Sequence, residues 1–132
     1  MERRLKKIER IRAVQEKMHR LAEAKLAALD RERQENASNQ ETLVSAFNRD
    51  DPLHGAFVEA MARRLAILAR EAATLQAARE AQNRALTEAG LKLRRTEKMN
   101  DRVRRQVRAE LGKRTFSDLL DVLAKTDDAS LP

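Results

Sequence analysis

A seam of mostly apolar residues runs through the second half of the chain at alternating steps of three and four. It holds for more than five repeats, and no proline interrupts it. Twelve positions carry it: Leu65, Leu68, Ala72, Leu75, Arg79, Gln82, Leu86, Ala89, Leu93, Thr96, Asn100 and Val103. A stripe this narrow is buried against another long helix and not around a globular core. The pattern therefore predicts a coiled coil.

The first half of the chain carries a second, less regular stripe. It begins with six apolar residues at helical spacing: Leu5, Ile8, Ile11, Val14, Met18 and Leu21. The stripe then shifts by one position to Ala22, Leu26 and Leu29, as at a stutter that locally unwinds a supercoil. A polar stretch at 33–40 follows, before apolar residues return at 43–47. We expect one helix over residues 2–48.

Asp51 and Pro52 mark a break between the two stripes. They read as an N-cap followed by the first residue of a new helix. The sequence predicts a turn at 49–52 and a second helix over 52–111, and so short a connection favours an antiparallel hairpin. Positions whose numbers add to roughly 100 should lie opposite each other, which pairs Leu5 with the neighbourhood of Thr96.

The hairpin should end near Gly112, a plausible C-cap. Beyond it, residues 115–118 fit a capping box loosely, and the apolar positions from Phe116 to Leu123 would form one face of a short helix. The fold class expected is all-α. An antiparallel coiled-coil hairpin of two long helices occupies residues 1–112, and residues 113–132 form a short C-terminal helix or a disordered tail.

Charge changes the picture of function. The net charge is +7, and the cations are concentrated in two segments. Residues 1–12 hold six Lys or Arg against two Glu, a net of +4, and residues 92–114 hold ten against three Glu or Asp, a net of +7. A hairpin brings both segments to its open end. A positive field of this kind suits an acidic partner, which can be nucleic acid, an anionic membrane surface or an acidic protein.

Candidate chemistry is sparse. The chain has no cysteine, and its two histidines, His19 and His54, lack metal-ligand spacing. With three glycines there is no phosphate-binding loop, and a two-helix rod offers no pocket that excludes water. No uncharged run is long enough to span a bilayer. We therefore expect no catalytic residue, no cofactor, no metal and no membrane insertion. Arg79 and Gln82 either extend their heads to water or fix the register of the seam.

Two stretches resemble a known family. The chain opens with a basic helix of the form Leu5-x-x-Ile8-x-x-Ile11, and the second helix contains the run ALTEAGLKLRRTEKM from Ala85 to Met99. Over residues 1–112 the sequence is similar to the FliJ/YscO family, the small stalk proteins of flagellar and virulence type III export machines.

The resemblance implies a non-enzymatic, cytoplasmic protein that lies peripherally at the export apparatus on the inner membrane. Its open end would insert into a hexameric export ATPase, and other regions would contact the export gate and, in some members, secretion chaperones. The implied ATPase contacts are Arg3, Arg4, Lys7, Arg95, Arg102, Arg105 and Arg108. The implied gate contacts are Phe57, Met61 and Leu68, although Arg64 replaces the small residue expected between them.

Two other functions compete with this reading. The first is a basic coiled coil that binds nucleic acid, which the charge favours. The mingled acids and the absence of Trp and Tyr disfavour it, because aromatic side chains stack on bases. The second is a structural scaffold, such as a parallel homodimer, which the break at Asp51 and Pro52 disfavours.

Overall fold

The computed structural model describes residues 2–49 and 55–130, and nearly all of them are helical. Helix α1 spans Glu2–Phe47 (46 residues) and helix α2 spans Gly55–Ser130 (76 residues). The contacts divide the chain into two units. We call residues 17–90 the central unit and residues 1–16 with 91–132 the terminal unit. Residues 50–52 of the predicted turn, with its cap residues Asp51 and Pro52, and His54 lie outside the described residues.

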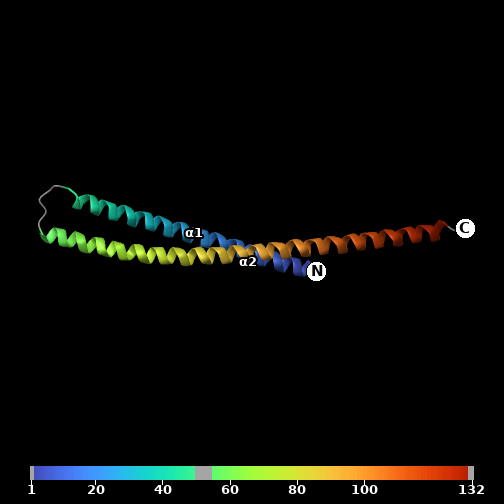
Figure 1. Cartoon of the computed structure of the whole chain (residues 1–132). Coiled ribbons are helices and arrows are strands. Elements are labelled where there is room, and N and C mark those ends of the chain that lie inside the picture. Colours follow the sequence, from blue (N-terminus) through green and yellow to red (C-terminus); the bar gives the residue numbers. More distant parts are fainter. Residues whose placement is uncertain (1, 50–54, 131–132) are drawn as a thin grey trace. The chain divides into compact units, whose positions relative to one another are not determined.

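In each unit a part of α1 lies antiparallel against a part of α2 (Figure 1). The described residues contain no strand. The predicted all-α fold, an antiparallel coiled-coil hairpin of two long helices, is therefore confirmed.

The predicted seam of α2 is confirmed at every position. All twelve residues from Leu65 to Val103 are buried or half-buried. The same alternation of three and four continues to Met61 before them and to Val107 after them, and both of these residues are buried. Strict heptad spacing correctly identified the face because a helix in a two-helix pair buries only its a and d positions.

The prediction for α1 is wrong between Ile8 and Ala22, although Ala22, Leu26 and Leu29 are half-buried as predicted. The next four residues of the predicted stripe, Ile11, Val14, Met18 and Leu21, are exposed, and there is no stutter. The buried and half-buried face keeps an unbroken alternation of three and four through polar residues: Leu5, Ile8, Arg12, Gln15, His19, Ala22, Leu26, Leu29, Arg33, Asn36, Gln40, Leu43 and Phe47. Long polar side chains can occupy such positions because their stems pack while their heads reach a partner or water.

Polar side chains join the two helices of the central unit. Asn36 Nδ2 donates a hydrogen bond to the Leu68 carbonyl oxygen (3.0 Å), and Asn36 Oδ1 accepts one from Gln40 Nε2 (2.6 Å). Gln82 Nε2 donates to the Ala22 carbonyl oxygen (3.1 Å), and Arg79 forms an ion pair with Asp30. Of the two readings of Arg79 and Gln82, these contacts support the one in which polar seam residues fix the register.

The register is close to the predicted one in the central unit and differs from it in the terminal unit. In the central unit the numbers of facing residues add to 104 for Asn36 with Leu68 and for Ala22 with Gln82. In the terminal unit they add to 113 for Glu9 with Arg104, and Leu5 packs against the cluster of Ile8, Val103 and Val107 instead of facing Thr96. In the terminal unit, counting outward from the turn failed because the packing of this apolar cluster places Leu5 beside Val103 and Val107.

Helix α2 does not end at Gly112 as predicted. It continues to Ser130, and no glycine in the described residues has a positive φ, so Gly112 is not a C-cap. The hydroxyl of Thr115 donates to the Leu111 carbonyl oxygen (2.9 Å), the bond of a Thr inside a helix and not of an N-cap. A single glycine costs a helix only about 1 kcal/mol, which the good helix formers around it offset.

Gly90 offers a test of packing between the two helices. The Cβ of an alanine there would lie 3.5 Å from His19 Nε2 and 3.7 Å from its Cδ2, which is ordinary van der Waals contact. We expect Gly90→Ala to raise the free energy of unfolding by about 0.5–1 kcal/mol, because alanine is the better helix former. Urea denaturation followed by circular dichroism measures this. A loss of stability would mean that His19 lies closer to Gly90 than the distance of 3.5 Å from the added Cβ indicates.

Candidate functional site

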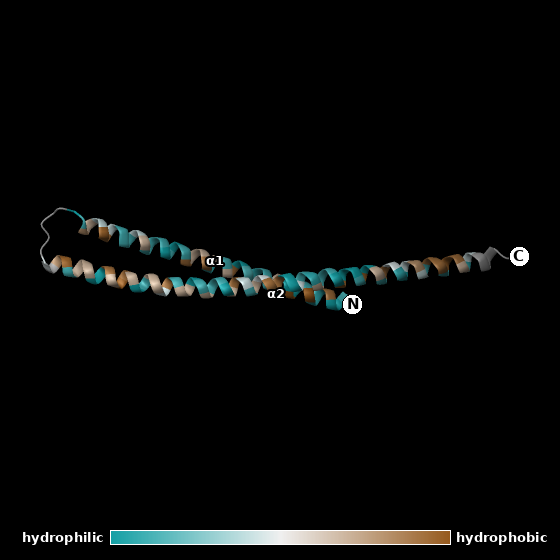
Figure 2. Cartoon of the chain, viewed as in Figure 1, coloured by the Kyte–Doolittle hydropathy of each residue, from teal (hydrophilic) through white to brown (hydrophobic). Residues whose placement is uncertain are grey.

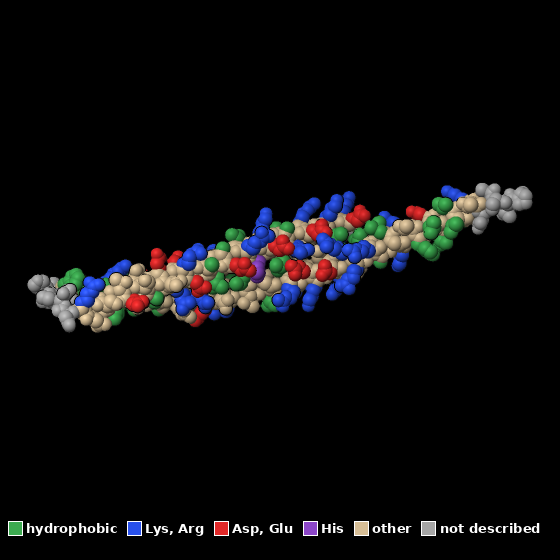
Figure 3. All heavy atoms as spheres, turned by 90° about the horizontal axis from the view of Figure 1, so that it is seen from above, with side chains coloured by type: hydrophobic (Ala, Val, Ile, Leu, Met, Phe, Trp, Pro, Cys, Tyr) green, Lys and Arg blue, Asp and Glu red, His purple; other side chains and the backbone are tan. Residues whose placement is uncertain are grey.

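The candidate site is the basic surface of the terminal unit, built from residues 2–12 of α1 and 92–114 of α2. The seam holds these segments together, because Ile8, Val103 and Val107 form its apolar cluster and Leu5 packs against them. Their outward positions are occupied largely by Lys and Arg. Blue side chains accordingly project from both helices in the middle of Figure 3. The arrangement presents positive charge on the two helices together.

Two cations of this surface are neutralised within the unit. Arg104 pairs with Glu9 across the helices (3.4 Å), and Arg12 pairs with Glu16 one turn along α1 (3.1 Å). Both pairs are partly exposed and contribute little to stability. Their consequence is local, since these two guanidinium groups are less available to a partner.

The seven cations implied as ATPase contacts behave differently. All seven are exposed, and all seven lie in the terminal unit, as the sequence led us to expect: Arg3, Arg4, Lys7, Arg95, Arg102, Arg105 and Arg108. Within the described part of the chain, none of them forms an ion pair with Asp or Glu. Their charge is therefore free to act on an external anionic group.

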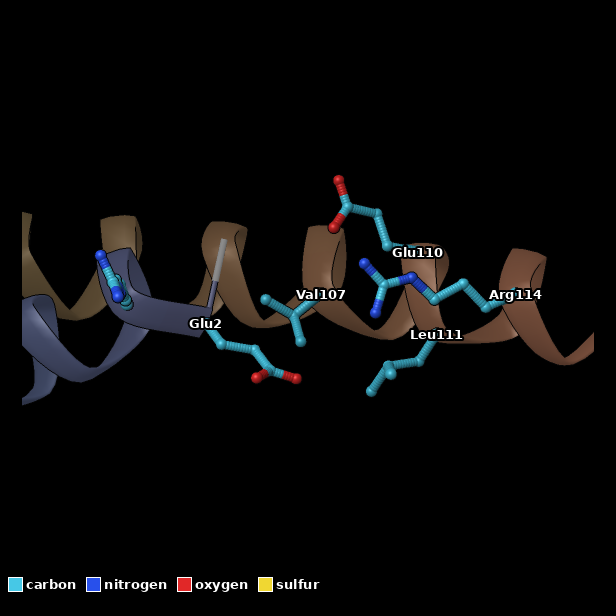
Figure 4. A pocket seen from close by; sticks show the side chains of 6 residues that line it. Glu2, Val107, Glu110, Leu111 and Arg114 are labelled. Atoms are coloured by element: carbon cyan, nitrogen blue, oxygen red, sulfur yellow. The ribbon is translucent and has the colours of Figure 1, made fainter.

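A shallow hollow of about 270 Å³ lies where α1 begins beside α2. It is lined by Glu2 and Arg3 of α1 and, on α2, by Val107, Glu110, Leu111 and Arg114 (Figure 4). Its rim is a mixture of carboxylates and guanidinium groups, and it is open to solvent. Such a hollow fits a polar side chain of a partner better than a small substrate, which normally needs an enclosed and largely apolar cavity.

The three residues implied as export-gate contacts do not form one exposed surface. Met61 and Leu68 are buried seam residues of the central unit, with 6% and 2% of their area exposed, whereas Phe57 is 53% exposed. Phe57, Met61 and Leu68 are four and seven residues apart and therefore lie on one face of α2. At Met61 and Leu68 this face is the seam that packs against α1. Phe57 alone of the three is accessible to a partner.

Sequence reasoning missed the burial of Asn36 and the position of His19, whereas it placed Asn100 in the seam. Asn36 and Asn100 are the buried polar residues of the described chain, and His19 lies in the seam beside Gly90 instead of in solvent. Extending the spacing of Leu5 and Ile8 by strict steps of four and three would have found His19 and Asn36. Among the described residues, no group of three or more metal-binding side chains converges, and no helix is long and apolar enough to cross a membrane.

The geometry thus presents a surface of exposed cations on paired helices. No family model, curated protein or solved structure matches this chain.

Proposed function

We propose that this chain is a non-enzymatic stalk protein of a type III protein export apparatus, whose basic terminal unit docks into a hexameric export ATPase and couples it to the export gate. The single observation that carries the proposal is the set of seven exposed cations of the terminal unit, which have no acidic partner within the described chain. The resemblance of residues 1–112 to the FliJ/YscO family supports the same role.

In this role the chain performs no chemistry. Paired helices give a stiff element, and the cations of the terminal unit meet acidic groups lining the ATPase ring. Gate or chaperone contacts would then use exposed residues elsewhere, with Phe57 as the remaining candidate for the gate. The protein would work in the cytoplasm, at the inner-membrane face of the apparatus.

The test uses the export ATPase of the same organism. We expect Arg3→Glu, Arg4→Glu and Lys7→Glu together to weaken binding of this protein to the ATPase by roughly tenfold or more, because three favourable charge contacts become repulsive. Arg3 and Arg4 lie in the first turn of α1, where acidic residues are favourable, and glutamate at the exposed Lys7 position is a good helix former, so α1 should remain folded. Fluorescence anisotropy at two salt concentrations measures the binding, and ATP hydrolysis measures the coupling.

The matched control reverses three exposed cations of the central unit, Lys25, Arg31 and Arg63. It makes the same change in net charge, and we expect binding to the ATPase to change by less than about twofold. Equal losses in both triple variants would reduce the effect to net charge and refute specific docking. Binding to duplex DNA in preference to the ATPase would favour the nucleic-acid reading.

A further inference from the structure

The end of α2 carries an apolar face that α1 does not cover. Phe116, Leu119 and Leu123 are 62%, 55% and 52% exposed, and brown residues gather there in Figure 2. At about 100° per residue, they lie roughly 120–180° around α2 from Val107, the last buried residue of the seam. The apolar face therefore lies on the opposite side of α2 from the hairpin seam.

Before Phe116 in the sequence, the same face of α2 is basic. Stepping back from Phe116 by alternating four and three residues passes Gly112 and Ala109 and then reaches four cations. These are Arg105, Arg102, Lys98 and Arg95, and all are exposed. We call this line from Arg95 to Leu123 the outer stripe, with a basic half and an apolar half. It is a second heptad register on α2, parallel to the seam.

Among the residues of the terminal unit that the structure describes, none packs on the apolar half. Every residue from Arg108 to Thr126 is exposed. Green side chains accordingly gather on the extension of α2 in Figure 3. Helices in water are held mainly by packing an apolar face, and contiguous exposed apolar residues on one face mark interaction sites. Gly112 has no atom within 4 Å of where a Cβ would stand, so a partner backbone can come close there.

Charge selects among the possible occupants. A second copy laid in parallel on the stripe would set cations against cations, and an antiparallel copy would set the apolar half against Arg and Lys. An anionic lipid surface would repel the acidic end of the chain, where 115–132 holds four Asp and one Lys. A helix with carboxylates beside one half and apolar residues beside the other satisfies both halves at once.

We propose that the outer stripe docks an acidic amphipathic helix of a partner protein, whose carboxylates face the basic half and whose heptad apolar residues pack on Phe116, Leu119 and Leu123. This docking goes beyond the proposed ATPase contact, because the ATPase contact does not use the apolar half of the outer stripe. The two share Arg95, Arg102 and Arg105, and the test therefore leaves the first turns of α1 unchanged.

The probes are two synthetic heptad peptides long enough to cover residues 95–123. One carries its glutamate-rich half before its leucine-rich half and the other after it, to allow both directions of binding. Matched peptides with Lys in place of Glu serve as controls. Fluorescence anisotropy with the full chain should show that one acidic peptide binds and that neither Lys peptide does.

Variants of the chain locate the binding. We expect Leu119→Glu with Leu123→Glu, and separately Lys98→Glu with Arg102→Glu, to weaken binding of the acidic peptide by roughly tenfold or more. All four residues are exposed, and glutamate is a good helix former, so circular dichroism should show unchanged helix content. Leu21→Glu, at an equally exposed apolar position of α1, is the control and should leave binding unchanged.

Four results would overturn the proposal. The first is that neither acidic peptide binds, and the second is that the chain with Leu119→Glu and Leu123→Glu binds as well as the parent. The third is that the chain alone forms dimers in sedimentation that this double variant abolishes, which would make the occupant a second copy. The fourth is that the chain adsorbs to vesicles of equal parts phosphatidylcholine and phosphatidylserine with the same dependence on Leu119 and Leu123, which would make the occupant a membrane. The ATPase assay with Arg3, Arg4 and Lys7 reversed is independent of all four.

Discussion

Replacing Leu68 with alanine should lower the free energy of unfolding by about 2–4 kcal/mol, the usual range for deleting a buried leucine side chain. Leu68 is 2% exposed and lies at a seam position of α2. Its carbonyl oxygen accepts the hydrogen bond of Asn36 Nδ2, and the substitution retains that oxygen. The loss therefore measures packing alone.

Urea denaturation followed by far-UV circular dichroism checks this, with Ile67→Ala as the matched control. Ile67 precedes Leu68 on the same helix but is 40% exposed, so we expect it to cost about 0.5 kcal/mol or less. If Leu68→Ala were as stable as the parent, the side chain would lie on the surface, where the family resemblance had implied a gate contact.

The contrast between the two helices shows what the sequence could predict. In α2 apolar side chains coincide with the heptad positions, so spacing and hydropathy pointed to the same face, and every predicted seam residue was right. In α1 they diverge, because His19 and Asn36 occupy seam positions while Met18 and Leu21 face solvent. Only the unbroken alternation of four and three distinguishes these faces, and the choice of apolar residues over strict spacing produced the false stutter.

The gathering of the cations in one unit was easier to predict than the core. Clusters of Lys and Arg can be recognised directly in the sequence, and the hairpin topology is enough to bring Arg3 and Arg102 into one unit. The sequence did not show that Met61 and Leu68 are buried in the seam, because both are as suitable for a seam as for a docking patch and only the phase of the heptad distinguishes these positions. The length of α2 was underestimated at Gly112, because one glycine is a weak helix terminator without a left-handed backbone conformation.

The second large prediction concerns Asn100. We expect its replacement to stabilise the protein, whereas the replacement of Leu68 destabilises it. Asn100 is fully buried in the seam of the terminal unit, and neither its amide oxygen nor its amide nitrogen has a hydrogen-bond partner among the described residues. Burying polar groups without partners costs about 1–3 kcal/mol. Leucine and asparagine side chains both branch at Cγ, so leucine replaces asparagine here with little change of shape.

We therefore expect Asn100→Leu to stabilise the pairing of the terminal unit by about 1–3 kcal/mol, because it removes an uncompensated amide and adds apolar burial. Native-state hydrogen exchange at the backbone amides of α1 residues 5–15 measures that pairing locally. The matched control is Asn36→Leu in the central unit, which removes the hydrogen bonds of Asn36 to Leu68 and Gln40. It should destabilise by about 1–2 kcal/mol.

The pair of asparagine variants also separates two reasons for a polar seam residue. A buried asparagine in a coiled coil lowers stability but restricts register and partner. If Asn100 has this role, Asn100→Leu chains should be more stable and yet form additional species, detectable as dimers in sedimentation, because an all-apolar seam accepts other helices. A destabilised Asn100→Leu chain would show instead that the amide is satisfied in solution, and the seam at Asn100 would then be held by hydrogen bonding, as it is at Asn36.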